Sequence, residues 1–178
     1  MKITDLATIR THLKQMTESD YTDMKEYLTD EYAMRFFDHG VMSEEMIQDF
    51  LTRGNRVFPI ILNSENKIIG HIFLGEWFAK DTYEIGWVLN KNYHKKGIMT
   101  EVAEAVMEYA FANMNAHRIV ATCQPENIAS KRICEKLNMR LEGEFKKCIY
   151  IERLDEWWDE LFFAILKEEY IERKNKDV

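Results

Sequence analysis

A change of hydrophobic period at Gly97 constrains the fold of this chain more than any other feature. Before Gly97, the segments 57–62, 67–74 and 82–89 are rich in β-branched and aromatic residues and are separated by turn residues, which predicts an antiparallel meander. From Gly97 to Met114, apolar residues recur every three or four positions, which predicts one long helix. A strand therefore leads into a strong helix through a short polar segment.

Helical and strand patterns also occur on both sides of this junction. Thr17 and Ser43 each precede a helical pattern in the manner of an N-cap. The second of these helices is expected to bury Met46, Ile47, Phe50 and Leu51. Further segments predict strands near 9–13, 118–123, 140–147 and 160–166, a helix at 127–137 and a frayed tail over 172–177. We expect an α+β fold with one mixed, mostly antiparallel central sheet flanked by about four helices.

Length and composition limit the organisation and the partners of the chain. A chain of 178 residues suits one domain, and we expect residues 1–178 to form it. A formal net charge of -7 disfavours nucleic acid and membrane surfaces as partners and suits cationic substrates. Cys123, Cys134 and Cys148 show no C-x-x-C pairing, so we predict no disulfide framework, no metal site and a reducing cytoplasm. We expect no signal peptide, because the first residues lack an apolar h-region, and no membrane span, because no apolar segment is long enough to cross a bilayer.

The junction at Gly97 is the best candidate for a binding site. The first N–H groups of a helix lack intrahelical partners and carry partial positive charge, so they bind phosphate oxygens. Gly97 permits close approach of a ligand to the main chain, and Lys95 and Lys96 add positive charge to an acidic protein. The alternative is an ordinary helix start with solvated lysines.

The residues around Gly97 resemble the acetyl-CoA-binding motif of the GNAT superfamily of N-acetyltransferases, Q/R-x-x-G-x-G/A. The segment 94–99 reads HKKGIM, so the central glycine matches, whereas His94 and Met99 depart from the commonest residues. The flanking segments 84–90 and 100–102 resemble the RimJ/RimL-like branch, whose members acetylate protein N-terminal amines and, in relatives, small amines. The resemblance implies the three-layer fold of this superfamily.

A second segment, 127–139, resembles the family pattern N-x-x-S-x-x-x-x-E-K-L-G-F. Asn138 and Met139 replace the usual Gly-Phe, and we expect Asn138 to take the left-handed conformation of a helix C-cap. Asn127 is also explained as an N-cap without any contact to a cofactor. Because both segments occur in the family order and spacing, the chain is identified as a member of the GNAT superfamily over nearly its whole length.

This resemblance implies acetyl-CoA as co-substrate and a set of residues that would bind it. Main-chain N–H groups of one turn would hold the pyrophosphate, and they belong to His94, Lys95, Lys96, Gly97, Ile98, Met99 and Thr100. Val88 and Leu89 would hydrogen-bond the pantetheine and the acetyl carbonyl, while Asn127 and Ser130 would lie along the pantetheine arm. The resemblance implies no metal.

Acetyl transfer needs a neutral amine and a proton donor for the departing thiolate. Tyr150 stands where many GNAT enzymes carry a tyrosine beside the sulfur, so it is the predicted acid, with Ser130 as its rival. A tyrosine packed in the core is the alternative reading of Tyr150. Glu84 is the predicted base, and its alternative is an outward strand residue paired across the sheet.

The acceptor is predicted only as a class. The segment 155–160, which reads DEWWDE and precedes the last predicted strand, combines carboxylates and indoles that suit a cationic amine, although simple packing would also explain it. We expect direct transfer, in a ternary complex, to a protein N-terminal amine or a small-molecule amine. A polyamine or antibiotic acetyltransferase and a non-catalytic acetyl-CoA-binding module are the alternatives. The sequence is compatible with a homodimer.

Overall fold

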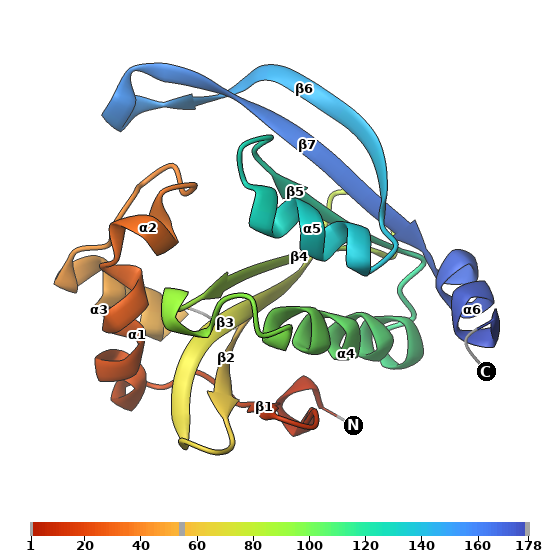
Figure 1. The fold of residues 1–178 in the computed structure, drawn as a ribbon, viewed down its shortest axis with the longest axis horizontal. Coiled ribbons are helices and arrows are strands. Elements are labelled where there is room, and N and C mark those ends of the chain that lie inside the picture. The colour runs from red at the N-terminus through yellow and green to blue at the C-terminus, as the bar shows by residue number, and fades with distance from the viewer. Residues whose placement is uncertain (1, 54–55, 177–178) are drawn as a thin grey trace. The chain divides into compact units, whose positions relative to one another are not determined.

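The computed structural model describes residues 2–53 and 56–176. A short strand is followed by a run of helices and then by a run of strands, and the rest of the chain contains both (Figure 1). The strands are β1 (Thr11–Leu13), β2 (Val57–Leu62), β3 (Lys67–Glu76), β4 (Thr82–Leu89), β5 (Arg118–Cys123), β6 (Arg140–Ile151) and β7 (Glu156–Leu166). The α-helices of the described residues are α1 (Tyr21–Leu28), α2 (Glu31–Met34), α3 (Glu44–Arg53), α4 (Ile98–Asn113), α5 (Ile128–Lys136) and α6 (Lys167–Lys176).

The seven strands follow the order β1-β2-β3-β4-β5-β7-β6 in one sheet. The pairs β1–β2, β2–β3, β5–β7 and β6–β7 are antiparallel. β4 pairs with β5 in parallel, through Thr82, Tyr83 and Glu84. The sheet is therefore mixed and mostly antiparallel, which confirms the predicted α+β class, with the short α2 and the C-terminal α6 beyond the expected helices.

The chain divides into two compact units, and each is described by itself. The first unit comprises Met1–Phe73 and Trp87–Val106, and the second comprises Leu74–Gly86 and Met107–Val178. The first unit thus holds α1, α2, α3, β1, β2 and the turn before α4, while the second holds β5, β6, β7, α5 and α6. None of the helices in residues 2–53 and 56–176 combines the length and the apolar character needed to cross a bilayer.

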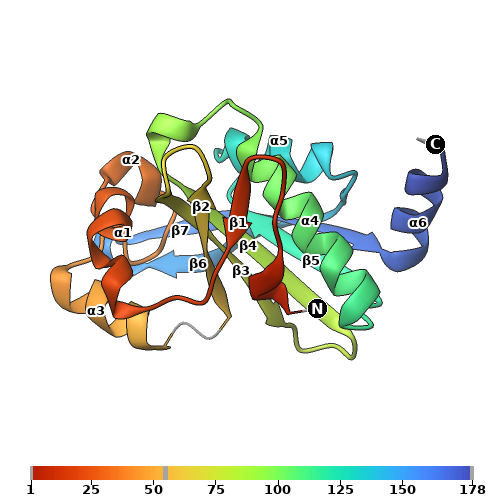
Figure 2. The ribbon, with the colours of Figure 1, turned by 90° about the horizontal axis from the view of Figure 1, so that it is seen from below.

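The core of the first unit joins its helices to β2 and β3. Met24, Tyr27 and Leu28 lie three and four positions apart on α1, so one face of that helix is buried. Helices α1 and α3 lie side by side in this unit (Figure 2). On α3, Ile47 and Leu51 are buried four positions apart. Met46 was expected on that face and is exposed, because it lies about 100° around the helix from Ile47. Phe50 is half-buried.

The second unit carries a long hairpin of β6 and β7, followed directly by α6 (Figure 1). Both strands are longer than predicted. Because almost every side chain of β6 is exposed, its sequence lacks the alternation that marks a half-buried strand. β7 begins at Glu156, so the 155–160 segment lies mostly within this strand and does not precede it.

The C-terminal segment differs from the predicted frayed tail. Residues Lys167–Lys176 form α6, and Tyr170 is buried with its ring 5.0 Å from that of Phe111. This aromatic contact stabilises a helix whose sequence is otherwise strongly polar. The predicted tail also included Asp177, which lies outside the described residues.

Gly70 of β3 lies in close contact with the main chain of β4. A Cβ atom at this position would lie 2.3 Å from the carbonyl oxygen of Val88 and 3.0 Å from the Cα atom of Leu89. We expect Gly70→Ala to lower the free energy of unfolding by about 3 kcal/mol, because main-chain atoms cannot move aside cheaply. Urea denaturation measures the change. Gly143→Ala is the matched control, since its Cβ atom would meet only a side-chain atom of Phe145, at 3.9 Å. Equal stability of the two variants would contradict the prediction.

His71 titrates inside the core of the first unit. Its Nδ1 atom lies 3.1 Å from the hydroxyl of Tyr27, and its ring lies 5.4 Å from that of Phe50. Burial lowers the pKa of His71 from 6.5 to about 4. As the pH falls below 6.5, His71 of the unfolded chain binds a proton, whereas His71 of the folded protein binds it only near pH 4.

We therefore expect the free energy of unfolding to fall by about 2 kcal/mol between pH 7.5 and pH 5 through His71 alone. Urea denaturation of the wild-type protein and of His71→Leu at both pH values measures this contribution as the difference between their pH dependences. The same pH dependence in both proteins would contradict the prediction.

Candidate functional site

The turn between β4 and α4 combines two left-handed residues with the start of a long helix. Lys95 has a φ of 61° and Gly97 a φ of 73°. Glycine adopts this conformation freely, whereas a lysine in it costs about 1 kcal/mol. The turn therefore depends on contacts from the rest of the first unit.

Several such contacts surround the turn on its β4 side. Asn90 is buried, and its side-chain oxygen accepts a hydrogen bond from the N–H of Asn92 at 3.1 Å. The hydroxyl of Tyr93 donates to Glu65 at 2.5 Å. Lys91 forms an ion pair with Asp30 of the N-cap of α2. These contacts fix the first half of the turn before the left-handed residues begin.

The two residues that depart from the family motif have clear structural roles. The Nε2 atom of His94 lies 2.9 Å from the carbonyl oxygen of Leu89, so the imidazole ties the turn to the end of β4. Met99 is 4% exposed and packs inside the first unit. Both side chains therefore make contacts away from the main-chain N–H groups at the start of α4.

The start of α4 has the features of an anion-binding site. The N–H of Glu101 donates to the carbonyl of Gly97 at 3.1 Å, so the N–H groups of Ile98, Met99 and Thr100 precede the intrahelical ladder. The side chains of Ile98 and Met99 are buried, while Lys95 and Lys96 are exposed beside the turn. Positive charge and main-chain donors therefore occur together, which is the combination that favours an anion at a helix start.

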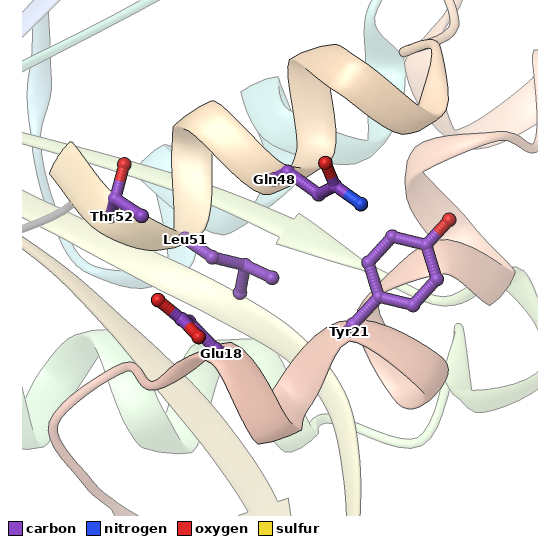
Figure 3. A pocket seen from close by; sticks show the side chains of 5 residues that line it. All are labelled: Glu18, Tyr21, Gln48, Leu51 and Thr52. Atoms are coloured by element: carbon purple, nitrogen blue, oxygen red, sulfur yellow. The ribbon is translucent and has the colours of Figure 1, made fainter.

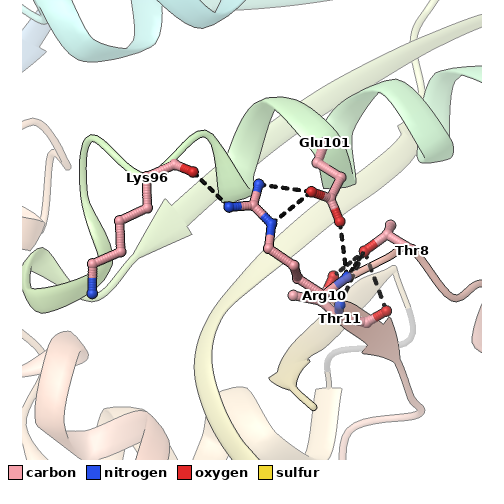
Figure 4. Close-up of polar contacts among 5 residues, drawn as sticks. All are labelled: Thr8, Arg10, Thr11, Lys96 and Glu101. Carbon is pink, nitrogen blue, oxygen red and sulfur yellow. Dashed lines mark hydrogen bonds and ion pairs between the residues drawn. The ribbon is translucent and has the colours of Figure 1, made fainter. Parts of the chain in front are cut away.

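Arg10 also contacts this turn, and sequence reasoning missed it (Figure 4). Its Nη1 atom donates to the carbonyl oxygen of Lys96 at 2.6 Å, and its Nε atom donates to Glu101 at 2.8 Å. Arg10 and Glu101 are separated by 91 positions, and no local pattern joins residues so far apart.

The two polar residues predicted from the second family segment lie at the start of α5, in the second unit. The side-chain oxygen of Asn127 accepts a hydrogen bond from the N–H of Ser130 at 3.2 Å, so Asn127 is the N-cap of this helix. Ser130 is half-buried. Asn138 has a φ of 55°, which confirms the left-handed C-cap.

Tyr150 lies on β6 and is 44% exposed, so the alternative of a tyrosine packed in the core is wrong. Its hydroxyl donates to Asp155 at 2.5 Å, and its ring lies 5.2 Å from that of Trp157. The hydrogen bond to Asp155, and to a smaller extent burial, raises the pKa of Tyr150 above its usual value of 10.

Glu84 shares one face of the sheet with Glu160. Glu84 of β4 lies opposite Val120 of β5, and Val120 lies opposite Ala164 of β7. Glu160 precedes Ala164 by four positions on β7. Opposed residues share a face and even spacing preserves it, so the two carboxylates lie on the same face. Both are half-buried. Burial first, and then the charge of Glu160, raises the pKa of Glu84 above 4.5.

Aromatic rings border this carboxylate pair. Phe162 lies two positions from Glu160 on the same face of β7. The Phe162 ring lies 6.0 Å from those of both Trp77 and Phe145. Two carboxylates with aromatic neighbours form a surface that suits an ammonium group.

The three cysteines of the second unit are poor nucleophiles. Burial, with a smaller contribution from Glu160, raises the pKa of Cys123 from 9.0 to about 11. Cys134 is fully buried and has its pKa raised, and burial also raises that of Cys148. All three are therefore thiols near neutral pH. Across residues 2–53 and 56–176, no three His, Cys, Asp or Glu side chains are grouped as metal ligands.

A pocket of about 440 Å³ lies in the first unit, beside α1 and α3 (Figure 3). Its lining residues are Glu18, Tyr21, Gln48, Leu51 and Thr52. None of the predicted cofactor or catalytic residues lines it.

The predicted site residues are divided between the two units. The first unit contains the predicted pyrophosphate turn 94–100 together with Val88 and Leu89. The second unit contains Glu84, Asn127, Ser130 and Tyr150.

Comparison with known proteins gives close relatives. Residues 10–140 match the sequence model of the acetyltransferase (GNAT) domain. The N-acetyltransferase YnaD of Bacillus subtilis, itself uncharacterized, is 44% identical over 169 residues, which cover 93% of this chain and 98% of that protein. The crystal structure of a GNAT-family acetyltransferase from Bacillus anthracis is 43% identical, with a TM-score of 0.88 over 92% of this chain and 99% of that one.

More distant structures share the fold. RimL, a ribosomal L7/L12 alpha-N-protein acetyltransferase in complex with coenzyme A, has a TM-score of 0.78 at 19% identity and covers 91% of this chain and 97% of its own. Spermidine N-acetyltransferase from Vibrio cholerae has a TM-score of 0.77 at 16% identity and covers 91% of this chain and 98% of its own. At such identities the likeness concerns the fold alone. The family match and the close relatives show that this chain belongs to the GNAT family and is an acetyl-CoA-dependent acetyltransferase, as the sequence around Gly97 predicts.

Proposed function

We propose that the chain is an N-acetyltransferase of the RimJ/RimL-like branch, which transfers the acetyl group of acetyl-CoA directly to a primary amine. The acceptor is a protein N-terminal amine or a small-molecule amine. The turn at the start of α4 carries this proposal, because its donors and lysines suit the pyrophosphate of the co-substrate. The shared fold of RimL supports the branch, and that of the spermidine enzyme supports a small amine as the alternative acceptor.

The cofactor residues follow from the turn and from the family pattern. Main-chain N–H groups from Lys95 to Thr100 hold the pyrophosphate, with the side chains of Lys95 and Lys96 beside them. The N–H of His94, also expected in this role, instead donates to the carbonyl of Lys91 at 3.2 Å. The main chain of Val88 and Leu89 pairs with the pantetheine, which Asn127 and Ser130 line. His94 already engages one lone pair of the Leu89 carbonyl, so this oxygen keeps a single lone pair for the ligand. Acetyl-CoA supplies the acetyl group itself.

Glu84 is the proposed general base. A carboxylate whose pKa is raised by burial and by a neighbouring charge is a stronger base than a solvated one. Glu160 places a second carboxylate on the same face, which favours an acceptor that arrives as a cation. The pair also favours a polyamine or a cationic antibiotic as the second candidate acceptor.

Tyr150 is the proposed acid for the departing thiolate, with Ser130 as its rival. The hydrogen bond that Tyr150 donates to Asp155 holds its proton in the resting protein. Transfer of that proton to the sulfur would require the hydroxyl to leave Asp155. Direct transfer, without an acetylated cysteine, is supported by the raised pKa values of all three thiols.

Three broader features remain proposals. We propose that residues 1–178 act as one domain, since β3, β4 and α4 each contribute residues to both compact units. A cytoplasmic location and a homodimer stay predictions of the sequence.

Release of free CoA thiol tests the function. The protein is mixed with acetyl-CoA and with separate panels of N-terminal peptides, polyamines and aminoglycosides. We expect turnover with at least one panel, and the panel that reacts identifies the acceptor class. Tight binding of acetyl-CoA with no turnover on any amine would favour a non-catalytic binding module, and binding of neither would reject the proposal.

The carboxylate pair predicts a pH dependence. Glu84 must be ionised to accept a proton, so the acidic limb of kcat/KM for the amine follows its pKa. Glu160→Gln removes the neighbouring negative charge, lowers the pKa of Glu84 and shifts this limb to lower pH. Glu152→Gln is the control, because Glu152 is an exposed carboxylate between β6 and β7. An unmoved limb in Glu160→Gln would remove Glu84 from the base role.

Replacement of the phenol tests the acid. We expect Tyr150→Phe to lower kcat by about 100-fold, with little change in the KM for acetyl-CoA, because general-acid catalysis is lost while binding is kept. Steady-state kinetics on the reacting amine give both constants. Unchanged turnover in Tyr150→Phe, together with a loss in Ser130→Ala, would assign the role to Ser130.

A further inference from the structure

Arg10 connects the start of β1 to the start of α4 within the first unit (Figure 4). Thr8 closes a tight turn before β1, because its N–H donates to the carbonyl of Thr11 at 2.7 Å. The hydroxyl of Thr8 accepts hydrogen bonds from the N–H groups of Arg10 at 3.3 Å and of Thr11 at 3.0 Å. The main chain of Arg10 is therefore fixed before its side chain reaches the turn.

The guanidinium of Arg10 makes three charged or polar contacts. Nε donates to one carboxylate oxygen of Glu101 at 2.8 Å, and Nη2 lies 2.7 Å from the same oxygen. Nη1 donates to the carbonyl oxygen of Lys96 at 2.6 Å. The other oxygen of Glu101 accepts from the main-chain N–H of Arg10 at 3.1 Å. One side chain thus holds both the turn and the first turn of α4.

These contacts meet two requirements of the proposed pyrophosphate site. The carbonyl of Lys96 lies between the left-handed Lys95 and Gly97, and its bond to Arg10 fixes the peptide plane at this point. Glu101 would repel a phosphate at the start of α4. Burial alone would raise the pKa of Glu101, but hydrogen bonds from Thr8 and Arg10 outweigh it and lower the pKa. Glu101 therefore remains ionised, and Arg10 balances its charge.

We propose that Arg10 is a positioning residue of the cofactor site, which sets the Lys95–Gly97 main chain so that its N–H groups meet the pyrophosphate. This inference rests on the proposed function of that turn. Each nitrogen of the guanidinium contacts Glu101 or Lys96, so we assign Arg10 a role that acts through the turn. Its side chain has no role in the chemistry of acetyl transfer.

The test compares acetyl-CoA with S-acetylpantetheine, which carries the same thioester and lacks the pyrophosphate. We expect Arg10→Met to raise the KM for acetyl-CoA about ten-fold, the size of one lost charged hydrogen bond, and to leave kcat nearly unchanged. The kcat/KM for S-acetylpantetheine should stay the same. Arg10→Lys should restore part of the loss. An equal loss with both thioesters would reduce Arg10 to a general stabiliser of the fold.

Two controls separate the remaining outcomes. Arg140→Met is the first control, because the side chain of Arg140 is 41% exposed and that of Arg10 is 40% exposed. Arg140 forms ion pairs with Glu142 and Glu169 in the second unit, so its loss should leave the KM for acetyl-CoA unchanged. The second control is the acetyl thioester of 3′-dephospho-CoA, for which Arg10→Met should raise the KM as much as it does for acetyl-CoA. An effect that disappears with this analogue would place Arg10 on the 3′-phosphate and overturn the positioning role.

Amide hydrogen exchange of the ligand-free protein tests the positioning role without any turnover. We expect faster exchange in the 94–100 segment of Arg10→Met than in the wild type, with unchanged exchange in β2. Unchanged exchange in 94–100 would overturn the inference even if the enzyme uses acetyl-CoA. Conversely, a wild-type protein that fails to bind acetyl-CoA would overturn the proposed function, whatever the exchange shows.

Discussion

Main-chain N–H groups that have no partner within α4 are the constraint on which the proposed cofactor turn depends. The first donors of α4 must remain outside the helical ladder, while the carbonyl groups beside them must still be satisfied. The first unit meets this demand with side chains from separate segments of the chain. The ring of His94 bonds the Leu89 carbonyl, and the guanidinium of Arg10 bonds that of Lys96. Polar side chains thus satisfy these two carbonyls, and the first N–H groups of α4 are left for the proposed pyrophosphate.

The need to leave the first N–H groups of α4 uncovered also explains why His94 and Met99 are compatible with the family motif. The commonest GNAT motif has a small residue where this chain has Met99, and a bulky side chain there would be harmful only if it lay over the donors. Met99 is buried, so its bulk contributes to the core. His94 replaces a longer polar side chain and ties its ring to the preceding strand. Both substitutions are absorbed by packing and hydrogen bonding around the turn.

Local features were predictable from the sequence, and long-range pairings were not. Strand and helix periods located β2, β3, β4, α4 and β5, and the asparagine cap of α5 followed from its position. The length of β6 was missed because exposed strands carry no alternation, and α6 because one buried tyrosine is a weak signal. Arg10 and Glu101, 91 positions apart, show no shared pattern. Glu160 was recognised only as part of an acidic cluster, since its alignment with Glu84 depends on the register of three strands.

The half-buried pair of Glu84 and Glu160 has a further consequence for how a substrate would be received. Burial first, and then repulsion from Glu160, raises the pKa of Glu84. A cation that binds beside the two carboxylates would offset this repulsion and lower that pKa. In the proposed role of Glu84 as the base, acceptor binding and the proton affinity of the base would then be thermodynamically linked, so the affinity for a cationic acceptor would itself vary with pH.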